Sequence, residues 1–455
     1  MRDPSRLRLP LFLTALAVPL LLVAGCGGPA AAPGDTRQEQ RAPVNQGAAW
    51  LVGQLQHGLM HNQQYDFDDY GLSLDAETAL AAVGGHRAEV RRIAHSVAGH
   101  IRSYIGNRSG SEQYSGSIAK ALVGAQTAGM DPHHFGGVDL VSHLEALIDT
   151  SGATAGRVHD KVDPADPKDA DYANVIGQAL AVQGLAKAGS PKTRSATRFL
   201  LEQQCSTGGF RLSFSPAAAK NQSCSGSGAA SKPDVDVTAL AVLALRPQRA
   251  HRNVAATIKA AFRWLLQQQR GDGSFAGGTT TASPNANSTG LAGWALGVTG
   301  HRQAAARAAA WVRAHQVVDE PPCTSRLSND RGAIGYDDAV LQAGRRKGIG
   351  KVSSDQWRRA TVQALPALQW ARPPTGNLRL TRPTGSASPG SAQRFRVSGL
   401  PPGAPFCLSA PGHAVAGAAD FQGTGSASLA LPNHKTVTVT VTDGTRSRHQ
   451  TLKLG

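Results

Sequence analysis

The sequence predicts a mostly helical protein, in which a large domain of helical hairpins is followed by a small β-sandwich. Two observations carry this prediction. Ala- and Leu-rich helical segments recur through residues 45–372, and short segments with alternating apolar residues fill residues 376–455. The chain has 455 residues, of which 41% are hydrophobic and 17% are charged. This composition supplies a large core and carries too little charge for a disordered chain.

The first 25 residues have the features of a secretory signal. Arg2, Arg6 and Arg8 give a positive start, and residues 9–24 form an apolar stretch too short for a comfortable membrane span. This stretch ends in Val-Ala-Gly and is followed by Cys26. These residues resemble the signal of bacterial lipoproteins, which implies cleavage before Cys26 and lipidation of its thiol and new amino group. The alternative is an ordinary signal peptide with an incidental cysteine.

The segment that follows the signal predicts how the protein is attached to the cell membrane. Residues 26–44, rich in Gly, Ala, Pro and Gln, indicate a flexible tether. We therefore expect a protein outside the cytoplasm, attached to the cell membrane through its lipid anchor. The net charge of +16 is scattered, without a long Lys/Arg run that has interleaved aromatic residues. This pattern favours a solvated face near an anionic membrane surface, and no nucleic-acid partner is expected.

The four remaining cysteines are expected to pair outside the cytoplasm. Cys205 and Cys224 flank one loop with 18 residues between them and form the natural pair. Cys323 with Cys407 would link the two domains, and this second pairing stays open. C-x-x-C spacing is absent, so a cysteine-based zinc site is not expected, and the sequence indicates no metal or cofactor.

The helical domain contains an internal repeat. Residues 199–210 (FLLEQQCSTGGF) and 264–275 (WLLQQQRGDGSF) share an aromatic residue, Leu-Leu, Gln-Gln and a Gly-containing turn closed by Phe. Fainter copies begin at Trp50 and Trp311. Six Ala/Leu-rich helices start 42 to 62 residues apart, and their small apolar faces suit packing around a buried centre. These helices start near Asp75, Ser117, Asn174, Asp236, Ser288 and Asp337.

Six hairpins of this kind resemble the α/α-toroid superfamily of terpenoid cyclases and protein prenyltransferase β-subunits. The Gln-x-Gly-x-aromatic ends are similar to the QW repeats of squalene cyclases, with Phe in place of Trp. The resemblance covers residues 45–372 and implies an α6/α6 toroid. In such a toroid the second helix of each hairpin lies in an inner ring, and its start faces the mouth of a central cavity. An open helical solenoid is the alternative.

The pattern of apolar residues in the last 80 residues differs from that of the helical domain. Pro373 and Pro374 end the last helix, and short segments rich in Val and Thr follow at period two. Turn residues separate these segments, as in residues 400–403 (LPPG). This pattern is typical of strands and predicts a small Ig-like β-sandwich over residues 376–455.

Polar residues gather at the starts of the six predicted inner helices. Four of the six Tyr residues of the chain lie there, and a Tyr side chain, with its apolar ring and polar tip, suits a ligand cleft. Helix capping is the competing explanation for the Asp, Asn, Ser and Thr residues. The candidate ligand-binding residues are Tyr70, Asp75, Tyr114, Asp171, Tyr172, Asn174, Gln178, Thr238, Asn287, Tyr336 and Asp337.

One segment carries a candidate catalytic motif. Residues 234–239 (DVDVTA) resemble the DxDDTA motif of squalene-hopene-type cyclases, in which the middle Asp protonates an alkene. The resemblance implies that Asp236 is the proton donor and Asp234 is the first Asp of the motif. Val237 replaces the last Asp, which removes part of the network that tunes the acid. The 23 aromatic residues of the chain are few for a cavity that must stabilise carbocations.

These observations favour a binding protein over an enzyme. We expect the toroid mouth to hold an apolar ligand, isoprenoid-like or corrinoid-like, or a protein partner. The corrinoid option rests on architecture alone, because transcobalamin-like proteins also combine a toroid with a C-terminal β-domain. The alternative is a terpenoid-cyclase-like enzyme that uses Asp236. A structural module whose centre is filled by side chains is the third possibility.

The lipidation signal is directly testable. We expect the change Cys26→Ala to release or mislocalise the protein and to abolish incorporation of labelled fatty acid, because the acyl chains depend on this residue. Metabolic labelling followed by cell fractionation measures both effects. Label retained in the variant would contradict lipidation at Cys26.

Overall fold

The computed structural model describes residues 36–455 with short gaps at 108–109, 164–169, 226–230, 279–280 and 382–386. The predicted signal segment and Cys26 lie outside the described residues. Helix α1 (Thr36–Gly53) begins inside the segment predicted to be a flexible tether, so that prediction is wrong for its last residues. Val44, Ala48 and Leu51 of this helix are buried against the core, which stabilises the helix there. No helix of the described residues is long and apolar enough to cross a membrane.

An inner ring of six helices forms the centre of the large domain. Each helix packs against the next, and the last packs against the first, so the ring is closed. Small residues bring neighbouring helices together: a Cβ atom on Gly177 would lie 3.3 Å from the Cα atom of Gly116 on the adjacent helix. The inner helices are α2 (Tyr70–Val83), α5 (Ser115–Ala128), α7 (Val175–Ala188), α9 (Val235–Leu245), α11 (Ala286–Val298) and α14 (Lys351–Ala364).

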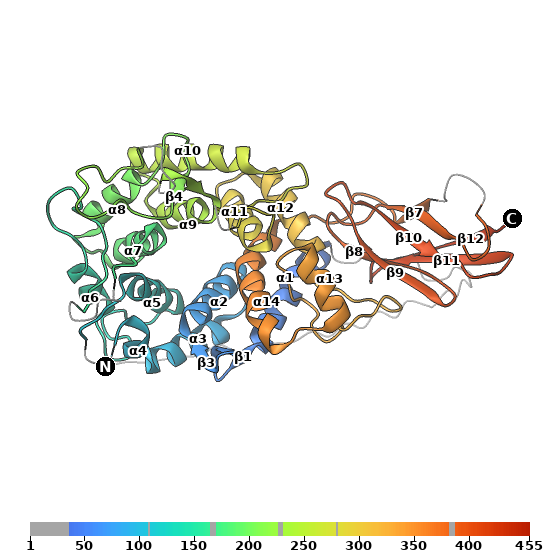
Figure 1. Cartoon of the computed structure of the whole chain (residues 1–455), viewed down its shortest axis with the longest axis horizontal. Coiled ribbons are helices and arrows are strands. Elements are labelled where there is room, and N and C mark those ends of the chain that lie inside the picture. Colours follow the sequence, from blue (N-terminus) through green and yellow to red (C-terminus); the bar gives the residue numbers. More distant parts are fainter. Residues whose placement is uncertain (1–35, 108–109, 164–169, 226–230, 279–280, 382–386) are drawn as a thin grey trace, which may run out of the picture.

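A second set of helices surrounds this ring. In Figure 1, α8 and α10 lie at the outer edge of the helical part, and α7 and α9 lie inside them. The closed ring within a ring is the α/α toroid predicted from the sequence, and it excludes an open solenoid. The outer helices are α1, α3 (Arg87–Gly99), α6 (Leu140–Ala146), α8 (Thr193–Glu202), α10 (Arg252–Gln268) and α12 (Arg302–Ala314). The remaining helices are α4 (Ile101–Ile105), α13 (Asp338–Lys347), η2 (Arg246–Gln248) and η3 (Leu365–Trp370).

The sixth inner helix is not the one predicted from the sequence. The prediction placed it at the segment that starts near Asp337, but that segment is α13, which has only Leu341 and Gly344 buried. Helix α14 completes the ring instead, with Trp357 and Thr361 among its buried residues. The polar start of α13 resembled an inner-helix start because Asp337 caps it, accepting a hydrogen bond from the Val340 N–H group at 2.8 Å.

A turn with the pattern Gly-x-apolar recurs five times and connects the two rings. Each glycine has a positive φ between 86° and 101°. Each also packs against the backbone of the next outer helix, where an added Cβ atom would lie 2.1 to 3.2 Å from a backbone oxygen. Only glycine fits such a position without strain. The five glycines are Gly58, Gly156, Gly208, Gly273 and Gly332.

The same turns also fix the inner helices. Two residues after each glycine, the N–H group of an apolar residue donates a hydrogen bond of 2.8 or 2.9 Å to a side chain of an inner helix. The donors are Met60, Val158, Phe210, Phe275 and Ile334, and the acceptors are, in the same order, Ser73, Gln178, Thr238, Thr289 and Thr361. Each turn therefore holds one inner helix and two outer helices in register.

Glutamines at the ends of outer helices reinforce these turns. The Gln204 side chain donates to Gly208 O and to Thr257 O of α10. The Gln269 side chain donates in the same way to Gly273 O and to Ala304 of α12. These are the last glutamines of the two repeats found in the sequence. Gln316, which follows α12, donates to Pro43 O of α1 at 2.9 Å and so closes the outer ring.

The C-terminal residues form two antiparallel sheets around one apolar core. One sheet has the strand order β10-β7-β6 and the other β12-β11-β8-β9. Phe395, Leu408 and Val439 are fully buried between them. The Ig-like assignment stays a prediction. The strands are β6 (Arg379–Thr381), β7 (Ala392–Ser398), β8 (Pro405–Ala410), β9 (His413–Ala418), β10 (Thr424–Ala430), β11 (Thr436–Thr442) and β12 (Ser447–Lys453). Shorter strands within the helical domain are β1 (Leu55–Gln56), β2 (Leu59–Asn62), β3 (Phe67–Asp69), β4 (Phe210–Arg211) and β5 (Pro233–Asp234).

Two disulfides stabilise the chain. The Cys205–Cys224 bond confirms the pairing predicted from the loop, and Cys323 is bonded to Cys407 across the two domains. A second contact also joins the two domains, because the guanidinium group of Arg307 on α12 lies 5.6 Å from the centre of the Phe421 ring. Two disulfides support a location outside the cytoplasm.

The role of the Gly-x-apolar turns can be tested at the last one. Thr361→Val keeps the side-chain shape but removes the oxygen atom that accepts the Ile334 N–H group inside the core. An unpaired buried donor costs about 1–3 kcal/mol, so the free energy of unfolding should fall by that amount. Urea denaturation measures it. Thr150→Val, at an exposed loop position, is the matched control. Equal stabilities of the two variants would contradict the structural role of this hydrogen bond.

Candidate functional site

The inner ring encloses a cavity of about 420 Å³, here called the central cavity. All six inner helices contribute to its wall, and the spacing of Ile176, Leu180 and Gln183 is that of one helix face. The volume lies in the range of small-molecule sites. The apolar lining residues are Ala79, Val123, Ile176, Ala179, Leu180, Leu240, Leu243, Pro247, Leu291, Trp294, Val298, Val362 and Pro366.

An ion pair interrupts this apolar wall. The Lys120 ammonium group on α5 lies 2.8 Å from the carboxylate of Asp75 on α2. Burial opposes the charge of Lys120, but Asp75 and then Tyr104 favour it, so the pKa of Lys120 is raised. Lys120 therefore stays protonated, and the pair gives the cavity one polar point. The other polar lining residues are Thr78, Gln183, Arg246 and Gln363.

A second hollow of about 340 Å³ opens between the starts of α5 and α7. Lys120, Ile176 and Leu180 line both this hollow and the central cavity, so the two spaces are neighbours. We call it the tyrosine groove. The residues that define it are Tyr104, Tyr114, Tyr172, Asp160 and Asn174. The structure thus brings three of the predicted binding residues, Tyr114, Tyr172 and Asn174, to one place.

Hydrogen bonds explain how the edge of the groove is built. Asn174 caps α7 by accepting from the N–H groups of the next turn. Asp160 accepts from the Ser115 N–H and hydroxyl groups with one oxygen atom and from the Tyr172 N–H group with the other. Asp171 forms an ion pair with the buried Arg157 at 2.9 Å. The Tyr172 side chain itself is free of this scaffold and 71% exposed, which leaves it available to a ligand.

Asp234 and Asp236 lie at the start of α9. Asp234 caps the helix by accepting from the Asp236 and Val237 N–H groups at 2.8 and 3.0 Å. Burial, and then the charge of Asp234, raise the pKa of Asp236 to about 6, against a smaller opposing effect of the Ser288 hydroxyl group. Within the described part of the chain, one buried carboxylate oxygen of Asp236 has no hydrogen-bond partner. Capping explains Asp234 but not Asp236.

The start of α11 adds further polar atoms beside Asp236. The Asn287 Oδ1 atom is buried without a hydrogen-bond partner among the described residues, and the buried Ser288 hydroxyl group lies beside the Asp236 carboxyl group. Burial raises the pKa of Tyr336, and the charges of Asp236 and Asp337 raise it further. The Tyr336 carbonyl accepts from the Ala286 N–H group at 2.8 Å, which holds Tyr336 at the start of α11.

The structure places some predicted site residues elsewhere. Gln178 and Thr238 are fully buried and bonded to the Gly-x-apolar turns, so their role is structural. Asp337 caps α13, outside the inner ring. Tyr70 packs on His100 and on Tyr104, with ring centres 5.3 and 6.0 Å apart. No group of three or more His, Cys, Asp or Glu residues in the described ranges is arranged to hold a metal ion.

Sequence reasoning missed the residues that line the central cavity below the helix starts. Leu243, Trp294 and Val362 lie one to three turns into their helices, on the faces that the helical period turns inward. The search for polar helix starts passed over them because they are apolar. Tyr104 was missed because α4, a single short turn that precedes α5, has no periodic pattern of its own.

Comparisons with known proteins show distant similarity in structure alone. No family model and no curated protein sequence matches this chain. The type II terpene cyclase MstE from Scytonema shares 15% identity, the match covering 73% of this chain and 98% of the cyclase, with a TM-score of 0.49. A cellobiose 2-epimerase from Bacillus thermoamylovorans shares 10% identity over 73% of this chain and 98% of its own, with a TM-score of 0.48. An unsaturated glucuronyl hydrolase from a Bacillus species shares 12% identity over 72% and 96%, with a TM-score of 0.43. Similarity at this level carries no conclusion about chemistry.

The raised pKa of Asp236 predicts a pH-dependent stability. In the folded chain the Asp236 carboxyl group keeps its proton up to about pH 6, whereas in the unfolded chain it loses the proton near pH 3.8. Between these two pH values the folded state binds more protons than the unfolded state. The contribution of Asp236 to stability therefore falls as the pH rises from about 3.8 to 6. Asp236→Asn removes this titration. Between pH 4 and 6, we expect the free energy of unfolding of the variant to rise relative to that of the parent chain by about 1.4 kcal/mol per pH unit.

Urea denaturation at several pH values measures this difference. Asp272→Asn is the matched control, because Asp272 is exposed and an Asn there can still accept the hydrogen bond from the Ser274 N–H group. The pH profile of the control variant should run parallel to that of the parent chain. If the Asp236→Asn profile also runs parallel, the carboxyl group of Asp236 is not held in the protonation state described above.

Proposed function

We propose that this protein is lipid-anchored outside the cytoplasm and binds a small, mostly apolar ligand in the central cavity. The observation that carries the proposal is a cavity of about 420 Å³ whose wall is built by all six inner helices. The two disulfides support the location, and the sequence around Cys26 supports the anchor. A module with a filled centre is disfavoured by the same cavity.

The lining indicates the chemistry of the ligand. Apolar side chains form most of the wall, so removing apolar ligand surface from water supplies the main driving force. The ion pair of Asp75 and Lys120 offers one point for a polar group. A linear isoprenoid with a polar end matches this arrangement. A corrinoid, with its broad macrocycle and many amide side chains, suits a cavity of this size less well.

The neighbouring positions of the two hollows suggest an orientation for the ligand. Lys120, Ile176 and Leu180 line both spaces. The apolar chain would lie in the central cavity, and the polar end would lie on the side of the tyrosine groove. The exposed Tyr172 offers an aromatic ring and a hydroxyl group there, whereas the Tyr114 hydroxyl group already donates to the Glu112 carboxylate at 2.6 Å.

Catalysis through Asp236 is the second candidate function. The raised pKa of Asp236 and its unpaired carboxylate oxygen favour it, because a proton donor must hold its proton at working pH. Two features weigh against it. Val237 occupies the third acidic position of the motif, and Trp294 is the one aromatic residue among the described residues that line the central cavity. Binding therefore ranks first.

The binding proposal predicts the effect of filling the cavity. Leu243→Trp places a larger side chain in the cavity wall and should weaken binding of geranylgeraniol, used here as the apolar probe, by about tenfold or more. Titration followed by intrinsic fluorescence or calorimetry measures the affinity. Leu266→Trp is the matched control, because Leu266 lies on α10 and is 39% exposed.

The two candidate functions give different results in this experiment. Saturable binding of one probe per chain, lost in Leu243→Trp and kept in Leu266→Trp, supports the binding site. Equal affinities of both variants would contradict it. Conversion of the probe to a cyclic isomer, abolished by Asp236→Asn while the probe still binds, would instead establish the enzyme.

A further inference from the structure

Asp236 and Asn287 occupy equivalent positions on two neighbouring inner helices. Thr238 on α9 and Thr289 on α11 each accept a hydrogen bond from a Gly-x-apolar turn, at 2.8 and 2.9 Å. Asp236 and Asn287 each precede one of these threonines by two positions, and the two helices pack against each other. The two side chains therefore start at the same height in the ring, near its mouth.

Both residues stand above the wall of the central cavity. Leu240 and Leu291, which follow Asp236 and Asn287 by four positions, line that cavity. Residues four positions apart share one face of a helix, and their side chains lean toward the helix start. Asp236 and Asn287 therefore belong to the inward faces of α9 and α11, one turn closer to the mouth than the apolar lining.

Two oxygen atoms at this height are unpaired. One carboxylate oxygen of Asp236 and the amide oxygen of Asn287 are buried without a hydrogen-bond partner among the described residues. Buried polar atoms are normally paired, because an unmade hydrogen bond is costly there. Both atoms are acceptors, so each of them calls for a hydrogen-bond donor.

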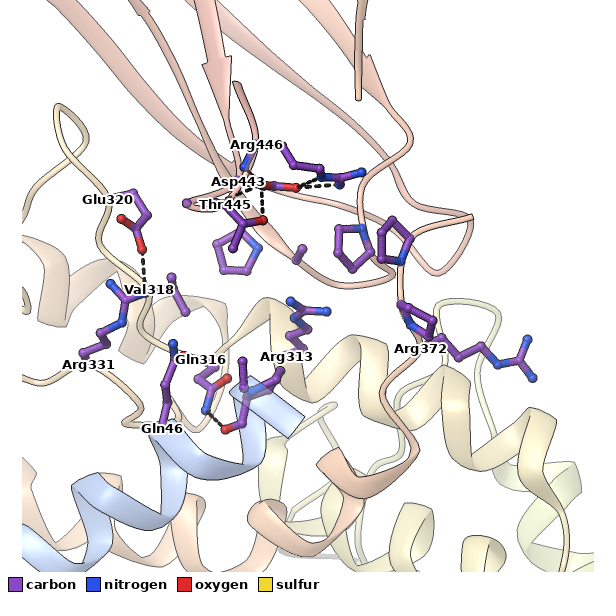
Figure 2. A pocket seen from close by; sticks show the side chains of 18 residues that line it. Gln46, Arg313, Gln316, Val318, Glu320, Arg331, Arg372, Asp443, Thr445 and Arg446 are labelled. Carbon is purple, nitrogen blue, oxygen red and sulfur yellow. Dashed lines mark hydrogen bonds and ion pairs between the residues drawn. The ribbon is translucent and has the colours of Figure 1, made fainter. Parts of the chain in front are cut away.

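The charge at this place is also unbalanced. Asp234 caps α9 with its carboxylate, and within the described part of the chain no Lys, Arg or His side chain forms an ion pair with Asp234 or Asp236. By contrast, at the hollow of about 100 Å³ between the two domains, the Glu320 carboxylate lies 2.5 Å from Arg331 (Figure 2). With a pKa of about 6, Asp236 is mostly ionised at neutral pH and has no such counter-ion.

Tyr336 brings an aromatic ring to the same place. Its carbonyl group accepts from the Ala286 N–H group at 2.8 Å, at the start of α11, and the charge of Asp236 acts on its hydroxyl group. An ammonium group has three N–H donors for the two oxygen atoms, and the face of an aromatic ring attracts its charge. A calcium or magnesium ion requires more oxygen ligands, and no group of three or more His, Cys, Asp or Glu residues in the described ranges is arranged to hold one.

We propose that the mouth of the central cavity contains a subsite for a primary ammonium group, with Asp236 as its counter-ion and Asn287 as the second acceptor. The inference rests on the proposed function, because the apolar part of the same ligand would fill the central cavity. Helices α2 and α5, which carry Asp75 and Lys120, lie across the closed ring from α9 and α11. An ammonium group would therefore bind on the opposite side of the ring from the cationic Lys120.

The test compares geranylgeranylamine with geranylgeraniol, two probes that share the apolar chain and differ in the polar end. At pH 7.5, with both probes below the concentration at which they form micelles, calorimetry should show that the amine binds the parent chain about tenfold more tightly than the alcohol, or better. Asp236→Asn keeps the size of the side chain and removes its charge, so it should abolish this preference while the alcohol still binds. Asn287→Ala should reduce the preference in part.

Asp272→Asn is the matched control, because Asp272 is exposed and lies outside the mouth. A preference for the amine that Asp236→Asn abolishes and Asp272→Asn keeps supports the subsite. Equal affinities of the parent chain for the two probes, or a preference unchanged in Asp236→Asn, overturn the subsite and leave the cavity as a site for apolar ligands.

Two further results are also decisive. If neither probe binds the parent chain, the proposed function fails and the subsite fails with it. If Asp236→Asn does not fold, the comparison with Asn287→Ala decides the result, because an unchanged preference in that variant overturns the subsite.

Discussion

A hydrogen bond from each Gly-x-apolar turn ties five of the six inner helices to the outer ring. It joins the N–H group of a buried residue to a buried side-chain oxygen, five times around the ring. The glycine of the same turn packs on the backbone of the next outer helix, where no side chain would fit. The last turn, at Gly332, packs on Gln46 of the first helix and so closes the ring. An open array would leave these groups without partners at one end.

The closed ring explains where the candidate sites lie. All six inner helices line one space, and their small residues and Leu side chains leave its centre open. Caps such as Asn174 and Asp234 fall at the helix starts because exposed N–H groups need acceptors there. Capping does not account for the exposed Tyr172 ring, the ion pair of Asp75 with Lys120, or the unpaired oxygen of Asp236. The proposal of a binding site rests on these features.

Local patterns predicted the helical hairpins, the first disulfide and two of the five turns, and the resemblance of the repeats to the α/α-toroid superfamily predicted the closed ring. The turns at Gly58, Gly156 and Gly332 escaped notice because Met, Val and Ile close them in place of Phe. The sixth inner helix was misplaced because α13 begins with a capping Asp and α14 with Lys351, although only α14 buries a Thr in the ring. Strands β9 and β12 carry little of the period-two apolar pattern, since small residues fill the first and polar residues the second. The central cavity depends on contacts between distant segments, which no local pattern contains.

Native mass spectrometry of the protein purified from its own host shows whether the closed ring holds an apolar ligand. We expect one non-covalent adduct per chain, with the mass of a small apolar molecule, that is released when the protein is unfolded. The binding proposal is wrong if the chain carries only the mass of its processed polypeptide and lipid anchor and takes up no apolar compound from an extract of its host.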